Sequence, residues 1–502
     1  MVKARRYHPL LILFKIWGFI KNSFVFVLFL FIINRESQSF IYKYGRPAFL
    51  IIGAISLIAI LLKWWTDKYK VSDMAFQLYS GVFIKSEQTV PFSKVENVSR
   101  RTSLFHRIFN MTSIQFETGM TGAEATVEFE VVSKVEADRL EKEMTKQAFE
   151  TVEMDEANDQ IVGEEITDTP IESRPPERII HFKPSKKDII KSSFTSLGFL
   201  ILIPLIVSIY SKIEQFFHVE DKATGLIEKG LNSWWILTLV VMILILASAA
   251  FGIIKTYISY GNYEIASDDK RIYITQGLLD ERAFSIAKDR VQAIVIKQTA
   301  LKRLFGLAEV KLVRVGELSD DDGEINTLYP FLPINRALAM ITEILPSYEV
   351  VEKMTCLPQK SLWIRLFKPS WFWIIASIAL FYTQPSLWNI KAAWWILSII
   401  LLIWILVLRL LDYQNTRYML HDHFIQYKSG SIATSLFVAK RDKVIEVEVS
   451  RTIVQKKFGL ASIELINRAK PVLHTVVDDV PIEWADSFYG WYADRRNEVN
   501  VE

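Results

Sequence analysis

The chain carries one pattern of residues three times, and this repetition constrains its fold more than any other feature. In each copy a glycine lies 13 residues before a basic residue, which lies 15 residues before a phenylalanine. Identical intervals in three copies indicate a true internal repeat. The sequence therefore predicts one structural module used three times. The glycine and basic positions are Gly81 and Lys94, Gly277 and Arg290, and Gly430 and Lys443.

Each copy is predicted to contain a strand, a short basic and apolar turn, and a second strand. In the second copy these are Val291 to Lys297, Thr299 to Phe305, and the residues after Gly306. The third copy has Gly459 at that position, and the first has Asn110. Alternating apolar residues in short runs favour half-buried strands, and a helical pattern closes each module. These signals predict a small β-sandwich or barrel with a C-terminal helix.

Long apolar segments precede each module and predict a membrane protein. Of the 502 residues, 51% are hydrophobic and 23% are charged, which is too apolar for an ordinary soluble chain and too charged for a purely membrane-embedded one. Segments of about 20 apolar residues are needed to cross a bilayer. The predicted α + β fold therefore has six transmembrane helices arranged as three hairpins. The predicted spans are Trp17–Ile33, Ala48–Leu62, Ser192–Tyr210, Trp234–Ile254, Trp371–Tyr382 (or a longer segment ending at Trp388) and Ala392–Leu408.

The distribution of Lys and Arg predicts the orientation in the membrane. Basic residues flank the second and third hairpins on the side of the modules, which favours a cytoplasmic location there. The loop with Arg35, Lys43 and Arg46 departs from this rule. Lys15 and Lys21 are expected to snorkel to the interface. No cleavage site follows the first segment, so an uncleaved multi-pass protein of the bacterial cell membrane is expected, with both termini cytoplasmic.

These signals divide the chain into modules, hairpins and linkers. The acidic segment 150–177 contains three prolines and is expected to be a disordered linker. The predicted parts are hairpin 1 (1–65), module 1 (66–149), the acidic linker (150–177), hairpin 2 (178–255), module 2 (256–348), a linker (349–364), hairpin 3 (365–411) and module 3 (412–495).

No residue pattern indicates catalysis or a cofactor. The chain has one cysteine and none of the common nucleotide, hydrolase or zinc motifs. The pair His421 and His423 is expected in an ordinary turn between strands, and Asp320–Glu324 in an acidic hairpin turn. A net charge of +3 gives no sign of nucleic-acid binding. We therefore expect a protein that is not an enzyme and that has no cofactor, no metal site and no nucleic-acid partner.

The second and third copies resemble the bacterial pleckstrin-homology-like (PH-like) domain family. The resemblance rests on Arg290-Val-Gln-Ala-Ile and on Gln298-Thr-Ala-Leu-Lys-Arg-Leu-Phe-Gly-Leu-Ala. Three such units, each behind a membrane hairpin, are similar to the YdbT-type membrane proteins of Gram-positive bacteria. The resemblance implies a PH-like sandwich with a C-terminal helix and no established enzymatic activity. It also implies a smaller membrane protein with one PH-like domain as a partner, and a connection with tolerance of membrane-active bacteriocins.

The basic and aromatic turn is the candidate partner or lipid interface. One interpretation has the phenylalanine and its apolar neighbours filling the sandwich while the cation faces water, and the apolar spacing favours it. The other places the turn at a lipid or partner surface. The candidate residues are Arg107, Phe109, Arg303, Phe305, Lys456 and Phe458.

The expected function is a membrane scaffold. Tripled binding-type modules next to membrane helices favour protein–protein assembly, as a homo-oligomer or hetero-oligomer at the bilayer, in envelope protection or resistance to antimicrobial peptides. A component of a peptide or lipid exporter is the alternative, although the predicted spans lack interior acids and arginines. A lipid-metabolising enzyme is a third class, for which no acid–base set is present.

Overall fold

The structure is a computed structural model that describes most of the chain. The chain forms two compact units, Met1–Ile180 with Ile258–Ala287, and His181–Tyr257 with Lys288–Glu502. The predicted acidic linker and the acidic turn Asp320–Glu324 lie outside the described residues. The described residues are 4–33, 39–72, 74–82, 84–118, 126–144, 178–195, 234–314, 327–351, 353–384, 394–469 and 472–494.

Each module follows one plan of six strands. Three antiparallel strands are followed by a one-turn 3-10 helix, and three more strands are followed by a C-terminal helix. A short α-helix lies between the fourth and fifth strands. The strands are β2 (Lys68–Val71), β3 (Ala75–Ser80), β4 (Ser86–Pro91), β5 (Val95–Thr102), β6 (Met111–Thr118) and β7 (Thr126–Ser133); β9 (Glu264–Ser267), β10 (Arg271–Gln276), β11 (Glu281–Ala287), β12 (Val291–Gln298), β13 (Leu307–Arg314) and β14 (Thr327–Pro333); and β16 (Arg417–His421), β17 (Phe424–Ser429), β18 (Thr434–Lys440), β19 (Val444–Ser450), β20 (Leu460–Asn467) and β21 (Leu473–Pro481).

The repeat signature marks the turns of this plan. A 3-10 helix lies between the third and fourth strands of each module, and its last residue is the basic residue Lys94, Arg290 or Lys443. These helices are η2 (Phe92–Lys94), η6 (Lys288–Arg290) and η8 (Arg441–Lys443). The upstream glycines lie before the third strand with positive φ of 95° to 118°. A Cβ there would overlap the carbonyl oxygen three residues later, so glycine is required.

The glycines also connect each module to the end of the long helix that precedes it. The N–H of Gly81 donates to Asp67 Oδ1 at 3.3 Å, and that of Gly430 to Asp412 Oδ1 at 3.1 Å. The N–H of Gly277 donates to the carbonyl of Gly261 at 3.0 Å. Each acceptor lies at the end of that helix, which is α2 (Phe40–Thr66), α8 (Trp234–Tyr260) or α13 (Trp394–Asn415), so the repeat includes the helix and the sandwich together.

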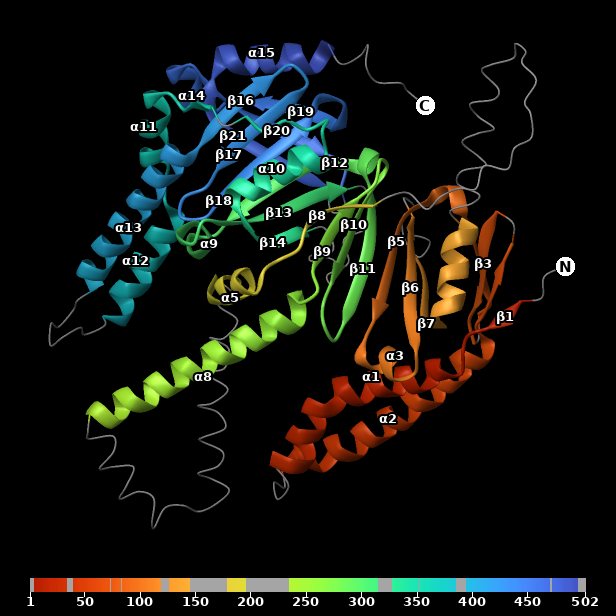
Figure 1. The fold of residues 1–502 in the computed structure, drawn as a ribbon. Coiled ribbons are helices and arrows are strands. Elements are labelled where there is room, and N and C mark those ends of the chain that lie inside the picture. Colours follow the sequence, from red (N-terminus) through yellow and green to blue (C-terminus); the bar gives the residue numbers. More distant parts are fainter. Residues whose placement is uncertain are drawn as a thin grey trace, which may run out of the picture. The chain divides into compact units, whose positions relative to one another are not determined.

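Neighbouring modules share sheets (Figure 1). The second sheet of module 1 continues into the first sheet of module 2, in the order β7-β6-β5-β11-β10-β9-β8, where β8 is Ile179–Phe182. The second sheet of module 2 likewise continues into the first of module 3, as β14-β13-β12-β18-β17-β16-β15, where β15 is Thr355–Cys356. The remaining sheets are β1-β2-β3-β4, where β1 is Arg5–Arg6, and β19-β20-β21. Two strands, β4 and β19, therefore end their sheets at the positions where other modules are joined.

Phenylalanines and aliphatic residues fill the described cores. In module 1 the rings of Phe76 and Phe116 are 4.7 Å apart at their centroids, and both side chains are fully buried. The helix at 134–144 begins with a serine cap, because the Glu136 N–H donates to Ser133 Oγ at 3.2 Å. In module 3 the helix α15 (Ile482–Ala493) buries Phe488 against β20 and β21. The C-terminal helix of module 2 is α10 (Ile334–Ile344).

Among the described residues, four helical segments are long and apolar enough to cross a membrane, and their side chains are largely exposed. Contiguous exposed apolar surface on this scale requires an apolar solvent. The segments are Leu10–Phe31, Tyr42–Thr66, Gln359–Thr383 and Trp394–Asn415. They include α1 (Leu10–Val27) with η1 (Leu28–Ile33), α2 (Phe40–Thr66), α11 (Gln359–Phe367), α12 (Trp371–Thr383) and α13 (Trp394–Asn415).

The first span was predicted to begin too late. Helix α1 begins directly after Pro9, seven residues before Trp17, and Lys15 lies inside it. Lys15 Nζ forms an ion pair with Glu130 on β7. The structure thus gives Lys15 a protein partner, where the sequence suggested snorkelling.

The fifth and third spans differ in how far the structure describes them. Helix α12 has 13 residues and rises about 20 Å, which is shorter than a bilayer core of about 30 Å. The predicted fourth span lies within α8 (Trp234–Tyr260). The first four residues of the predicted third span, 192–195, form the end of α5 (Lys186–Thr195). The rest of that span lies outside the described residues.

Candidate functional site: the basic helical turns and the module junctions

The basic turn of each module is a short helix with a cap at each end. The helices are α3 (Leu104–Ile108), α9 (Ala300–Leu304) and α14 (Ile453–Phe458). A serine or threonine precedes each helix, and Thr299 and Thr452 accept a hydrogen bond from the backbone three residues later. The residue after each turn has a left-handed φ, namely 53° at Asn110, 66° at Gly306 and 70° at Gly459. Asparagine tolerates this conformation better than other non-glycine residues, which explains the departure in module 1.

A polar residue, and not the phenylalanine, is buried beneath each turn. The side chains are His106, Lys302 and Gln455, which hold equivalent positions. His106 Nε2 is 2.8 Å from the carbonyl oxygen of Glu130, and Lys302 Nζ is 2.6 Å from Glu309 Oε2. Each buried polar group is thus satisfied, which a sandwich interior requires.

Burial and pairing shift the ionisation of these groups. Burial lowers the pKa of the His106 imidazole below its ordinary value, although the carbonyl of Glu130 opposes the shift. Burial alone would raise the pKa of the Glu309 carboxyl. The hydrogen bonds and charges of Lys302 and Lys311 outweigh it and lower that pKa. His106 therefore favours its neutral form inside module 1, whereas Glu309 favours its charged form.

The phenylalanines of the turns are exposed, so the expectation that they fill the sandwich is wrong. Their exposed fractions are 40% for Phe109, 45% for Phe305 and 39% for Phe458. The apolar neighbours Leu304 and Ile453 are also exposed. A spacing of three to four residues indicates one face of a helix, and here that face points away from the core. The second interpretation, a lipid or partner surface, agrees with this exposure.

The turns of modules 1 and 3 pack beside membrane helices. The ring of Phe14 on α1 lies 5.4 Å from that of Phe105 and 4.8 Å from that of His106. In module 3, α11 and α14 enclose a groove of about 640 Å³, whose apolar walls include Trp363, Phe367 and Phe458. The exposed apolar residues therefore lie close to the segments that are long enough to cross a bilayer.

The basic residues of the first two turns contact the next module along the chain. Arg107 Nη1 donates to the carbonyl of Leu278 at 3.0 Å, and its Nη2 lies 3.5 Å from Glu281. Arg303 Nη2 donates to Asn415 Oδ1 at 3.3 Å. The Asn415 amide in turn donates to the carbonyl of Ser431 at 2.8 Å. Lys456 is exposed, and its side chain has no ion pair or hydrogen bond to any residue that the structure describes.

Strand pairing accompanies these contacts with one register at both junctions. At the first junction Val98 of β5 lies opposite Ser285 of β11, and at the second Ile294 of β12 lies opposite Val438 of β18. In both cases the residue four positions after the basic residue of the earlier module pairs with the residue eight positions after the glycine of the next module. Arg101 adds a two-pronged ion pair to Asp280 at the first junction, with Nη2 to Oδ2 at 2.7 Å.

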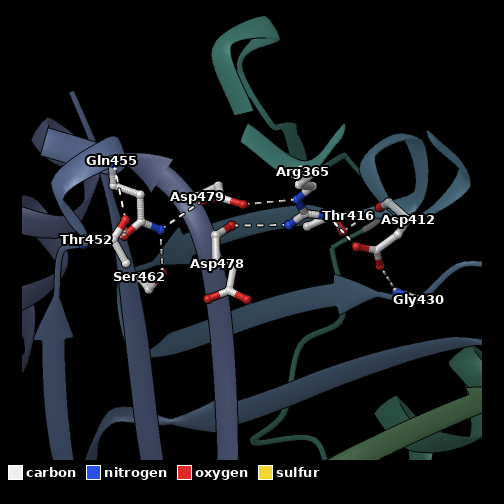
Figure 2. A network of polar contacts seen from close by, with 9 residues as sticks. All are labelled: Arg365, Asp412, Thr416, Gly430, Thr452, Gln455, Ser462, Asp478 and Asp479. Atoms are coloured by element: carbon white, nitrogen blue, oxygen red, sulfur yellow. Dashed lines mark hydrogen bonds and ion pairs between the residues drawn. The ribbon is translucent and has the colours of Figure 1, made fainter. Parts of the chain in front are cut away.

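A buried network fastens module 3 to its hairpin (Figure 2). Arg365 of α11 donates from Nη1 to Asp412 Oδ2 at 2.5 Å and from Nε to Asp479 Oδ2 at 3.3 Å. Asp479 Oδ1 accepts from Gln455 Nε2 at 2.9 Å, and Gln455 also donates to Ser462. The network thus links the start of the last membrane hairpin, the strand β21 and the basic turn.

The sequence identified the turns but missed the residues that hold them. His106, Lys302 and Gln455 share one position directly before the cation, and that shared polar position was a usable signal. Arg365 carries no such signal, because its partners come from distant segments. His421 and His423 lie at the β16–β17 turn as expected. Within the described ranges, no group of three or more His, Cys, Asp or Glu side chains could hold a metal ion.

Comparisons with known proteins agree with the repeat. Residues 23–148, 198–347 and 372–496 match the model of a protein family described as the bacterial PH domain, and together they span more than half of the chain. The chain is 23% identical over 505 residues to the UPF0699 transmembrane protein YdbT of Bacillus subtilis (strain 168). That match covers 98% of this chain and 99% of the relative. No solved structure matches the chain.

Proposed function

The chain belongs to the bacterial PH domain family, and from that premise we propose that it is a non-enzymatic membrane scaffold whose PH-like domains assemble proteins at the membrane. The observation that carries the proposal is the edge-to-edge strand pairing between modules, in one register at both junctions. Main-chain pairing at a sheet edge is a general mode of protein recognition. The modules therefore use their edges for association with other modules.

The exposed apolar turns suit a position at the bilayer surface. Ile108, Leu304 and Ile453 each expose more than three quarters of their surface. Burying one such side chain stabilises by about 1.5–3 kcal/mol. The turns of modules 1 and 3 pack beside membrane helices, so the lipid bilayer is the apolar phase within reach. In this proposal the turns hold each module against the membrane, and the edges of β4 and β19 stay available.

The proposal places the protein in the bacterial cell membrane as a multi-pass protein with cytoplasmic termini and modules. Cys356 is the single cysteine and is exposed on β15, so it reports the side on which the modules lie. A membrane-impermeant thiol reagent should not label Cys356 in intact cells and should label it after the cells are opened. Strong labelling of intact cells would contradict the orientation.

The proposed partners are proteins with PH-like modules, including a small membrane protein with a single such domain, and the process is envelope protection against membrane-active peptides. The chain should be tagged and isolated in mild detergent, with an unrelated tagged multi-pass protein as control. We expect a specific partner with a PH-like module, and a deletion strain that such peptides inhibit more strongly.

Complementation completes this test. The wild-type chain should restore peptide tolerance, whereas Ile108→Glu with Ile453→Glu should not, because two charges at the apolar turns oppose membrane contact. Val135→Glu is the matched control, since Val135 is exposed on the helix of module 1 outside the turns. Unchanged tolerance in the deletion strain together with turnover of a lipid or peptide by the purified chain would contradict the scaffold.

A further inference from the structure

Among the described strands, β4 and β19 end their sheets at the positions where other modules are joined, and the chain's own repeat makes these two edges complementary. We propose that β19 of one chain pairs with β4 of a second copy, head to tail, in the register that joins modules within the chain. This inference deepens the proposed scaffold function and rests on it. Strand β4 holds in module 1 the position of β11 and β18, which are joined. Strand β19 holds in module 3 the position of β5 and β12, which are joined to them.

The internal junctions fix the register between copies. At both junctions, the residue four positions after the basic residue of one module lies opposite the residue eight positions after the glycine of the next module. These pairs are Val98 with Ser285 and Ile294 with Val438. The same rule pairs Val447 of β19 with Thr89 of the second copy's β4. The antiparallel ladder then places Val449 opposite Glu87 and Ser450 opposite Ser86. Pro91, which cannot donate to a ladder, lies beyond this paired stretch.

The exposure of the two strands agrees with an edge that awaits a partner. The middle residues of β12 are buried, whereas in β19 Glu446, Glu448 and Ser450 are exposed. In β4, Ser86, Glu87 and Thr89 are exposed, whereas the middle of β11 and β18 is buried. The same place in the module is therefore covered where a neighbouring strand is described, and its side chains are exposed where no described strand is joined.

Lys456, the cation of the third turn, has no partner among the described residues and adds a second contact. At the internal junctions the cation reaches the carbonyl after the next module's glycine, directly from Arg107 to Leu278 and through Asn415 from Arg303 to Ser431. Lys456 occupies the same position in module 3. In the proposed assembly it points to the carbonyl of Val82, which follows Gly81, in the second copy.

Charge favours this head-to-tail pairing over a symmetric pairing of two β19 strands. An antiparallel β19 pair centred on Val447 would place Glu446 opposite Glu448 twice, and like charges directly opposite each other are destabilising. Pairing with β4 places Glu448 opposite Gln88 and Glu446 opposite Val90. A head-to-tail contact between different surfaces produces rings or open chains. Membrane tethering raises the effective concentration, so a modest edge contact suffices.

Cysteine cross-linking in membranes tests the register directly. In a Cys356→Ser background, one tagged chain carries Val449→Cys and a second, differently tagged chain carries Glu87→Cys. Oxidation should join the two tags, because the Cβ atoms of directly opposite strand residues lie about 4.5–5.5 Å apart, from where a small local shift allows a disulfide to form. The pair Val447→Cys with Thr89→Cys is a second register-matched test. The pair Glu448→Cys with Glu87→Cys is one residue out of register and should not form, because the side chains leave opposite faces.

An internal pair provides the positive control. Ile296 of β12 and Leu436 of β18 are opposite at the second junction and match Val449 and Glu87. A chain with Ile296→Cys and Leu436→Cys should form an internal disulfide under the same conditions. Lys456→Glu should lower the yield between chains about fivefold, the change that one exposed charged contact produces.

The outcomes separate this inference from the proposed function. A cross-link within the chain, with none between β19 and β4 in either matched pair, overturns the head-to-tail inference. A cross-link from Val449→Cys to a different membrane protein also overturns it, but leaves the scaffold function standing. If neither a second copy nor any specific partner associates and peptide tolerance is unaffected by deletion, both proposals fail.

Discussion

Strands β12 and β19 hold the same place in successive modules but have different surroundings. Both follow the 3-10 helix that ends in the basic residue, and both pair on one side with the next strand of their own module. On its other side β12 pairs with β18 of the following module, whereas β19 ends its sheet. The sequence of the module determines where the strand forms. The presence of a following module determines whether the side chains of that strand are buried.

The same difference extends to the cations of the turns. Arg107 and Arg303 reach the following module, whereas Lys456 reaches no residue within the described part of the chain. A junction therefore combines a strand edge and a cation, and module 3 presents both without joining another module in the part of the chain that the structure describes. The repeated residues therefore account for how modules join as well as for how each module folds.

The first test asks whether β19 is exposed only because module 3 is weakly anchored to the preceding helices. Arg365→Ala would leave the buried carboxylate of Asp479 without its cation. Breaking such a pair costs about 3–5 kcal/mol, whereas Lys15→Ala at the half-buried pair with Glu130 should cost about 1 kcal/mol. Thermal unfolding in detergent, followed by circular dichroism, checks both variants. Equal effects would mean that module 3 is not anchored as the structure indicates.

The second test compares the two strands themselves. Ile296 of β12 is buried and Val449, at the equivalent position of β19, is half exposed. Ile296→Ala should cost about 2–5 kcal/mol and Val449→Ala about 1 kcal/mol or less, because only the first leaves a cavity. The shift in unfolding temperature of the detergent-solubilised single chain measures both. A larger loss from Val449→Ala would remove the distinction between joined and open edges.

The third test concerns the turn that presents the joining strand β18. Gly430 has a φ of 118° and lacks room for a Cβ, so Gly430→Ala should destabilise module 3 by about 1–3 kcal/mol. Gly459→Asn should be nearly neutral, since Gly459 has open space and module 1 uses Asn110 at the same place. Denaturant titration compares the two. A neutral Gly430→Ala would contradict the structural reason for the repeated glycine.

The smallest expected effect is on the pH dependence of module 1, next to the first junction. Burial lowers the pKa of His106 in the folded state, with Arg101 acting in the same direction and Glu130 and Asp280 against it. Its stabilising contribution is complete above the ordinary pKa of 6.5 and falls as the pH drops through the lowered folded pKa, since the unfolded chain binds the proton more readily.

His106→Gln provides the matched comparison, because module 3 has Gln455 at this position. Amide exchange of β6 and β7 between pH 7.5 and 5 should rise in the wild type, beyond the intrinsic effect of pH, and less in His106→Gln. If both proteins lose protection equally, the carboxylates of module 1 and not His106 would account for the pH dependence.

The fold was predictable where the backbone demanded one residue type. Gly81, Gly277 and Gly430 are needed at positive φ, so their spacing survives in the sequence as a readable signature. The alternating strands and the closing helix of each module were predictable for a similar reason, and in the helix at 134–144 the buried face is Ala137, Leu140 and Met144. Each has one side against a core, which leaves a period in the residues.

The site was harder to predict, because the spacing of apolar residues along a helix does not show whether their side chains are buried or exposed. Leu301, Leu304 and Phe305 have the spacing of one helix face, yet Leu304 is largely exposed, and Lys302 is the buried residue of the turn. An apolar face looks the same whether a core or a membrane covers it. The pairing of β5 with β11 was likewise invisible, since backbone hydrogen bonds at an edge place few demands on side chains.

Amide hydrogen exchange of β12 and β19 in the full-length, detergent-solubilised protein tests the central claim most directly. At dilution, the amides of Ile294–Gln298 should be protected, while the outward-facing amides of Val447–Ser450 should exchange rapidly. At high concentration or in membranes, those amides should become protected as β19 finds its partner. Equal protection of β12 and β19 in the dilute single chain, or equal and rapid exchange of both, would contradict the account.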